Sequence, residues 1–195
     1  MVKLIEASGL EMREVVFEDG QSAVHYLAEV IYGINDVFLL APKVTTLELM
    51  EYFLNDTKTN YRDSLGYTCF HAVCMSGNVA AVNLLLSQGV DVNIDSYKYS
   101  ALHIAAQYRR EETVEILLSH GADANKPDAE RSTPLHALAR LCLCRCTNVT
   151  AFCDRRKPVD KIVRMLVDRG ADVEARDPHG DTRLCNRRCL VSTRN

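Results

Sequence analysis

The most regular pattern along the chain is a stripe of apolar residues at helical spacing, which occurs three times. Apolar residues three and four positions apart fall on one face of an α-helix, so each stripe predicts an amphipathic helix that buries one side. The stripes are Val79, Val82, Leu85 and Leu86, then Val114, Leu117 and Leu118, then Ile162, Met165 and Leu166. Each is followed by a glycine, at Gly89, Gly121 or Gly170, where a helix commonly ends in a left-handed residue.

A second, shorter helix is predicted ahead of each stripe. It opens with Thr or Ser and has His three residues later, at Thr68 and His71, Ser100 and His103, Thr133 and His136, and also Ser22 and His25. A Thr or Ser hydroxyl can accept a hydrogen bond from the free amides of the first helical turn. Pro134 suits the first helical position, where no amide hydrogen is needed. The pattern therefore predicts repeated pairs of antiparallel helices.

The pairs form a sequence repeat. Residues 63–93 align with residues 95–125 without a gap at a period of 32, so that Asp63 matches Asp95 and Asn93 matches Asn125. A third unit opens at Asp128, one residue later than this period predicts. A single unit cannot bury its own apolar face, so neighbouring units must stack to form a continuous core.

The repeat resembles the ankyrin family. Its hallmark, T-P-L-H, is complete at Thr133 to His136, and the family's G-A-D close is present at Gly121 to Asn125 and at Gly170 to Glu174. The resemblance covers roughly residues 19–185 and implies an all-α solenoid of stacked helix-turn-helix units with β-turn fingers. In this family the repeated histidine bonds backbone groups of the turns, which implies a structural role for His25, His71, His103 and His136.

The repeat divides the chain into six parts, two of which carry insertions. The parts are an N-terminal segment (1–18), a degenerate capping repeat with an insertion (19–60), two regular repeats (61–94 and 95–127), a repeat with a Cys-rich insertion at about 141–160 (128–176), and a truncated repeat with a tail (177–195). The spacing from His to Gly grows from 18 residues between His103 and Gly121 to 34 between His136 and Gly170.

The Cys-rich insertion leaves three interpretations open. It holds Cys142, Cys144, Cys146 and Cys153, and four thiolates can bind one zinc ion. The spacing C-x-C-x-C differs from the usual C-x-x-C knuckle, so ordinary buried or exposed thiols are the favoured interpretation, and a zinc site and a redox-sensitive loop are the alternatives. We expect no bound cofactor and no metal.

Composition and charge narrow the class of protein further. No apolar run approaches the ~20 residues of a membrane span, and acidic residues interrupt the N-terminus where a secretory signal would be apolar. We therefore expect a cytoplasmic or nuclear protein. The net charge is −3, with an acidic excess in residues 1–60 and a basic excess in residues 141–195. Either these are solvated faces or they help to choose a partner.

The function expected from these features is protein binding without catalysis. None of the common catalytic or nucleotide-binding motifs is present, and the basic C-terminus lacks the interleaved aromatic residues of a nucleic-acid interface. The family resemblance implies binding on the concave face of the array, through the turn fingers and the first helices. The candidate partner-binding residues are Tyr67, Met75, Tyr97, Lys98, Tyr99, Gln107, Tyr108, Arg109 and Arg131. The alternative interpretation is that some of these tyrosines pack between adjacent fingers.

The sequence thus predicts an adaptor or competitive binder for one or more proteins, with no nucleic-acid or membrane partner. The alternative function is a metal- or redox-responsive regulator built on the Cys-rich insertion.

Overall fold

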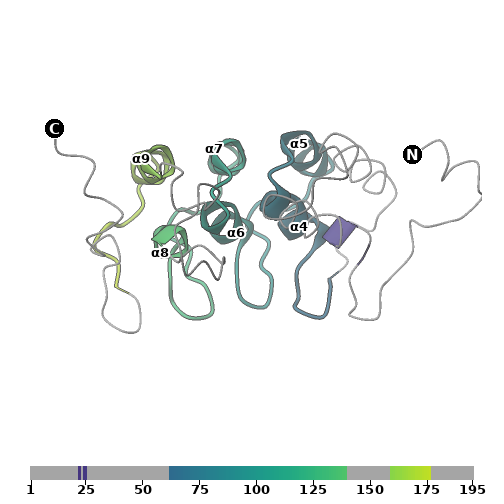
Figure 1. The fold of residues 1–195 in the computed structure, drawn as a ribbon, viewed down its shortest axis with the longest axis horizontal. Coiled ribbons are helices and arrows are strands. Elements are labelled where there is room, and N and C mark those ends of the chain that lie inside the picture. The colour runs from purple at the N-terminus through teal and green to yellow at the C-terminus, as the bar shows by residue number, and fades with distance from the viewer. Residues whose placement is uncertain (1–21, 23, 26–61, 140–158, 177–195) are drawn as a thin grey trace, which may run out of the picture.

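The computed structural model describes residues 22, 24–25, 62–139 and 159–176 of the 195-residue chain. In these residues the helices form two rows (Figure 1). One row holds the first helices of successive units, α4 (Cys69–Ser76), α6 (Ala101–Gln107) and α8 (Pro134–Ala139). The other holds the second helices, α5 (Val79–Ser87), α7 (Glu111–Ser119) and α9 (Asp160–Asp168). Long turns project from one side of the rows.

The predicted helix pairs are confirmed, and so is the way in which they begin. At α4, the Thr68 hydroxyl accepts the amide of His71, while Nδ1 of His71 accepts the amide of Thr68. This reciprocal capping box supplies partners to two backbone donors that a helix start leaves free. α8 begins at Pro134, as predicted. Gly89, Gly121 and Gly170 all have positive φ after the second helices.

The core runs between the two rows and is continuous from unit to unit. The predicted stripes supply much of it: Val82, Leu85, Val114, Leu117, Leu118, Ile162 and Leu166 are buried, while Val79, Leu86 and Met165 are half-buried. Ala72, Ala105, Ala106 and Ala137 are also buried, which fits their predicted role of allowing close helix approach. Helices of the same row contact each other across units, so the units stack as a solenoid.

Two asparagines join successive units on the side opposite the short interhelical turns. The Nδ2 group of Asn93 donates to the carbonyl of Gly121 at 3.2 Å, and its Oδ1 accepts the amide of Asp123 at 3.0 Å. Asn125 repeats both bonds one unit later, with the Gly170 carbonyl at 2.7 Å and the Asp172 amide at 2.6 Å. The segment that follows the second helix, which we call the close of the unit, is therefore bonded to the same segment of the next unit.

One alignment made from the sequence is wrong. Isolated antiparallel bridges close the first turn between Arg62 and Thr68 but the second between Asp95 and Ser100, so the second turn is one residue shorter. Asp95 therefore takes the place of Arg62, and Ser96 takes the place of Asp63. The gapless period of 32 hid this shift because the missing residue lies inside the turn.

The structure does not test the remaining predicted parts of the chain. The capping repeat, the Cys-rich insertion and the truncated repeat lie almost wholly outside the described residues, and the unit boundaries remain predictions. None of the helices in the described part is long and apolar enough to cross a membrane.

Candidate functional site

The predicted binding residues fall at two separate places on the array. We use the name fingers for the turns that precede the first helices: finger 1 (63–67), finger 2 (96–99) and finger 3 (128–132). Tyr67, Tyr97, Lys98, Tyr99 and Arg131 lie in these fingers, whereas Met75, Gln107, Tyr108 and Arg109 lie at the other end of the first helices. The structure therefore brings five of the nine together and places the other four apart from them.

Fingers 1 and 2 meet through an aromatic ring. A Cβ added to Gly66 would lie 2.5 Å from Cγ of Tyr97, so the Tyr97 ring rests directly on the Gly66 backbone, and only glycine leaves room for it. Even so, Tyr97 is 71% exposed, and the neighbouring Leu65 is 62% exposed. These two side chains are the most exposed large apolar residues among those described, and they lie on adjacent finger tips.

Fingers 2 and 3 meet through backbone and charge. The amide of Ala129 donates to the carbonyl of Lys98 at 3.1 Å, and the Lys98 ammonium pairs with Glu130. The same ammonium lies 5.1 Å from the centre of the Tyr99 ring. Its hydrogen bond to Glu130 is the main cause that raises the pKa of Lys98. These contacts hold the Lys98 side chain in place. Arg131 lies at the exposed tip of finger 3, where its backbone φ is 58°.

Tyr67 and Tyr99 are only partly exposed, and each ring lies beside the histidine of its own unit. Their ring centres lie 5.9 Å from His71 and 6.4 Å from His103, respectively. Burial is the first cause that raises the pKa of Tyr67. Of the three finger tyrosines, Tyr97 alone offers most of its ring to solvent.

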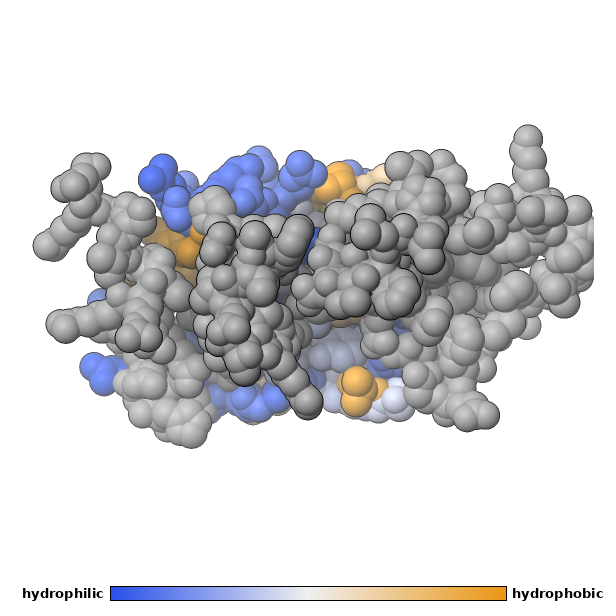
Figure 2. Space-filling view, viewed as in Figure 1, coloured by the Kyte–Doolittle hydropathy of each residue, from blue (hydrophilic) through white to orange (hydrophobic). Residues whose placement is uncertain are grey.

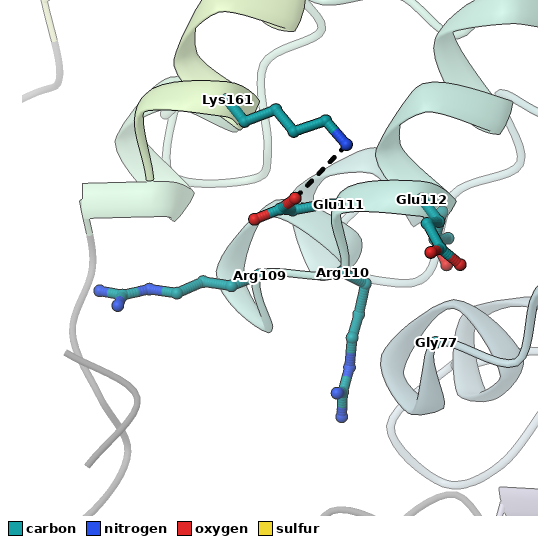
Figure 3. A pocket seen from close by; sticks show the side chains of 7 residues that line it. Gly77, Arg109, Arg110, Glu111, Glu112 and Lys161 are labelled. Atoms are coloured by element: carbon teal, nitrogen blue, oxygen red, sulfur yellow. Dashed lines mark ion pairs between the residues drawn. The ribbon is translucent and has the colours of Figure 1, made fainter. Parts of the chain in front are cut away.

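At the far end of the first helices, a hollow of about 280 Å³ lies between three units (Figure 3). Its lining residues are Gly77, Arg109, Arg110, Glu111, Glu112, Thr113 and Lys161. Both signs of charge are present, and Lys161 pairs with Glu111 at 3.5 Å, which joins α9 to α7. The mixture of charges does not favour one sign of ligand.

Arg110, which the sequence analysis did not single out, joins two units beside this hollow. Its Nε donates to the carbonyl of Met75 at 2.8 Å. The side chain crosses Gly77, where an added Cβ would lie 2.7 Å from Cδ of Arg110. The sequence did carry a signal that this position is unusual. Arg110 aligns with Asn78, and Asn78 caps α5 by accepting the amide of Ala81. Arg110 cannot act as such a cap, and α7 has none.

The described cysteines are Cys69 and Cys74, and both are free and buried. Burial raises the pKa of both thiols, and it does so most strongly for Cys74, so neither is a reactive thiolate. Within the described residues no three His, Cys, Asp or Glu side chains gather as a metal site. Cys142, Cys144, Cys146 and Cys153 lie outside the described residues.

Stacked helix pairs, fingers on one side and a histidine repeated in each unit define a helical repeat solenoid. Residues 37–128 match the family model of ankyrin repeats in three copies, so this part of the chain is an ankyrin-repeat array. Ankyrin repeats are protein–protein interaction modules and are generally not catalytic.

Two curated spider proteins contain a similar segment. Alpha-latrotoxin-Lhe1a of Latrodectus hesperus is 32% identical over 81 residues, which is 42% of this chain and 5% of that protein. Alpha-latrotoxin-Lg1a of Latrodectus geometricus is 31% identical over 95 residues, or 49% of this chain and 6% of that protein. The chain therefore matches only a small part of each relative.

Proposed function

We propose that this chain is a non-catalytic adaptor or competitive binder in the cytoplasm or nucleus, and that it contacts its protein partner through the finger tips. The observation that carries the proposal is the exposed apolar pair formed by Leu65 and Tyr97 on fingers 1 and 2. On the face seen in Figure 2 the described surface is mainly hydrophilic, with small, separate hydrophobic spots. On such a surface two large apolar side chains on adjacent tips are suited to act as anchors.

Tyr97 has the properties of a binding hot spot. Tyrosine supplies a large contact area with few rotatable bonds, and it is enriched among residues whose truncation costs an interface most. While the joint between fingers 1 and 2 is closed, its position is set before binding, because the ring rests on Gly66 and finger 2 is bonded to finger 3 at Lys98. Little conformational entropy would therefore be lost when a partner covers it.

The other candidates take supporting roles in this proposal. Lys98 and Arg131 would border the apolar pair, while Tyr67 and Tyr99 would hold the fingers through their histidine contacts. Met75, Gln107, Tyr108 and Arg109 would form a second contact area at the far end of the first helices, if the partner is large enough to reach it.

The test is site-specific photocrosslinking followed by affinity measurement. A photoreactive amino acid at position 97 should capture a protein that the same group at position 83, on the exposed face of α5, does not capture. The purified partner should bind Tyr97→Ala at least tenfold more weakly than wild type, with little change in the urea midpoint, because the ring is mainly exposed. Equal capture at both positions, or equal affinity of wild type and variant, would refute the proposal.

A further inference from the structure

The repeated histidines join each unit to the next through a defined tautomer. Nδ1 of His71 accepts the backbone amide of Thr68 at 3.2 Å. A backbone N–H can only donate, so Nδ1 carries no hydrogen and the ring proton is on Nε2. Nδ1 of His103 accepts the amide of Ser100 in the same way at 3.4 Å. His25 bonds a serine hydroxyl of its own unit through Nδ1 at 2.7 Å, while its Nε2 faces a carbonyl, which only accepts. Each of these rings therefore directs an Nε2–H group toward the following unit.

At two of the three joints this group has a carbonyl partner in the next finger. Nε2 of His25 bonds the carbonyl of Tyr67 at 2.9 Å, and Nε2 of His103 bonds the carbonyl of Ser132 at 2.9 Å. Nε2 of His71 has no hydrogen-bond partner among the described residues, although the side chain is 1% exposed. The Tyr99 carbonyl takes the corresponding place and is near enough to act on the pKa of His71, but it does not meet the ring at hydrogen-bonding geometry.

In fingers 1 and 3 the first residue is aspartate, and its side chain leaves the last carbonyl of the finger, that of Tyr67 or Ser132, available to the histidine of the preceding unit. Oδ1 of Asp63 accepts the amides of Leu65 and Tyr67. A carboxylate only accepts, so the Asp63 side chain donates nothing to the Tyr67 carbonyl. Within the finger this carbonyl receives one donor, the Asp63 amide at 2.9 Å. A carbonyl oxygen has two lone pairs, so one remains for His25. Finger 3 repeats this arrangement with Asp128 at its base.

Finger 2 has Ser96 at its base, and a hydroxyl can also donate. The Ser96 hydroxyl accepts the amides of Lys98 at 3.2 Å and Tyr99 at 2.7 Å, and it donates to the Tyr99 carbonyl at 2.8 Å. The Ser96 amide donates to the same carbonyl at 2.9 Å. Both lone pairs of the Tyr99 carbonyl are then occupied within the finger, and none remains for His71.

We propose that the joint between the 61–94 and 95–127 units is a hinge of the array, and that Ser96 creates it by occupying the carbonyl that would otherwise bind His71. A buried donor without a partner destabilises the closed joint relative to an open one in which water reaches it. Opening of this joint moves finger 2, and with it Tyr97, relative to finger 1. The inference does not depend on the proposed partner.

The hinge is also sensitive to acid. Burial and the positive charge of Arg62 lower the pKa of His71 to about 4, while Asp95 and the Tyr99 carbonyl act in the opposite direction and His25 lowers it further. Protonation at Nδ1 would in addition remove the lone pair that accepts the Thr68 amide. A charged ring therefore fits the open joint better than the closed one.

Hydrogen exchange compares the joints within one molecule. The Nε2 proton of His71, which has no partner among the described residues in the closed joint, should exchange with water about tenfold faster than the Nε2 proton of His103, which bonds the Ser132 carbonyl. Equal rates in the wild-type protein would overturn the proposal without the need for any variant.

Two substitutions at Ser96 separate the hydroxyl donor from other effects. Ser96→Asn keeps an acceptor for the two amides but removes the hydroxyl, and it adds no charge. It should slow exchange of the His71 ring proton toward the rate of the His103 ring proton and raise the pKa of His71, both followed by NMR of the ring. Ser96→Thr keeps the hydroxyl and should leave both readouts near wild type. The proposal fails if Asn and Thr variants behave alike.

Discussion

Asn125 tests whether the solenoid is held together by side-chain bridges at its unit closes. Its amide group bonds the Gly170 carbonyl at 2.7 Å and the Asp172 amide at 2.6 Å, and both partners belong to the next unit close. Asn125→Ala removes the two bonds together and leaves the exposed backbone as it was. The perturbation therefore acts on the contact between units and hardly on the core.

The expected loss follows from the number of bonds. A neutral hydrogen bond contributes about 1 kcal/mol net, so Asn125→Ala should lower the free energy of unfolding by about 2 kcal/mol. Asn93→Ala removes the corresponding pair of bonds, at 3.2 and 3.0 Å, and it should also cost about 2 kcal/mol. Asn125→Asp keeps the acceptor for Asp172 but places an oxygen against the Gly170 carbonyl, so it should lose about 1 kcal/mol or more.

The assay is urea unfolding followed by circular dichroism, with the slope compared between variants. Asn83→Ala is the matched control, because Asn83 is an exposed asparagine on α5 and alanine favours helix. It should change stability by less than about 0.5 kcal/mol. If Asn125→Ala is no more destabilised than Asn83→Ala, the bridges contribute nothing and stacking rests on apolar packing alone.

Two further predictions concern His71 and Gly77. The pKa of His71 is about 4 in the folded protein and 6.5 in the unfolded chain, so the unfolded state takes up the proton first as the pH falls. The contribution of His71 to the free energy of unfolding should be fully present above pH 6.5 and should decline by about 3 kcal/mol as the pH drops to 4. His71→Gln retains a capping box, so in urea titrations at several pH values this variant should lack that part of the decline. Gly77→Ala forces alanine into a φ of 77° and a Cβ against Arg110, so we expect a loss of about 2 kcal/mol in thermal or urea unfolding. In an Arg110→Ala background the same change should cost about 1 kcal/mol, and an equal cost in both backgrounds would show that Arg110 does not crowd the site.

Much of the fold was predictable because the signals are local. The apolar stripes, the Thr or Ser before each first helix and the glycines after each second helix act within one or two turns of the chain, and the structure places each as expected in the described units. The structural role of the histidines was predictable for the same reason. Their rings bond the capping residue three positions earlier in every described unit.

The binding residues were harder to predict, because exposure depends on the neighbouring unit. Tyr67, Tyr97 and Tyr99 are the same residue type in similar turns, yet only Tyr97 is mainly exposed. The difference comes from position within the turn: Tyr67 and Tyr99 directly precede the capping residues and lie beside His71 and His103, whereas Tyr97 stands at the tip, as Leu65 does in finger 1. The contact of the Tyr97 ring with Gly66 forms between two units, so the pattern of one unit does not reveal it. The later start of the third unit was the sequence signal that finger 2 is one residue shorter.

Comparison of equivalent positions within the chain shows where one joint departs from the others. At the unit close, Asn93 and Asn125 each donate to a glycine carbonyl of the following unit, but the same position in the next close is Glu174. Its amide still bonds the carboxylate of Asp172 at 2.9 Å, as the amides of Asn93 and Asn125 bond Asp91 and Asp123, so the turn itself is preserved. A carboxylate cannot donate, however, and a glycine carbonyl facing Glu174 would be repelled. The asparagine bridges therefore hold α5 to α7 and α7 to α9 and cannot continue beyond Glu174 in the same form, so any unit stacked on α9 must be held by apolar packing or by a different polar contact.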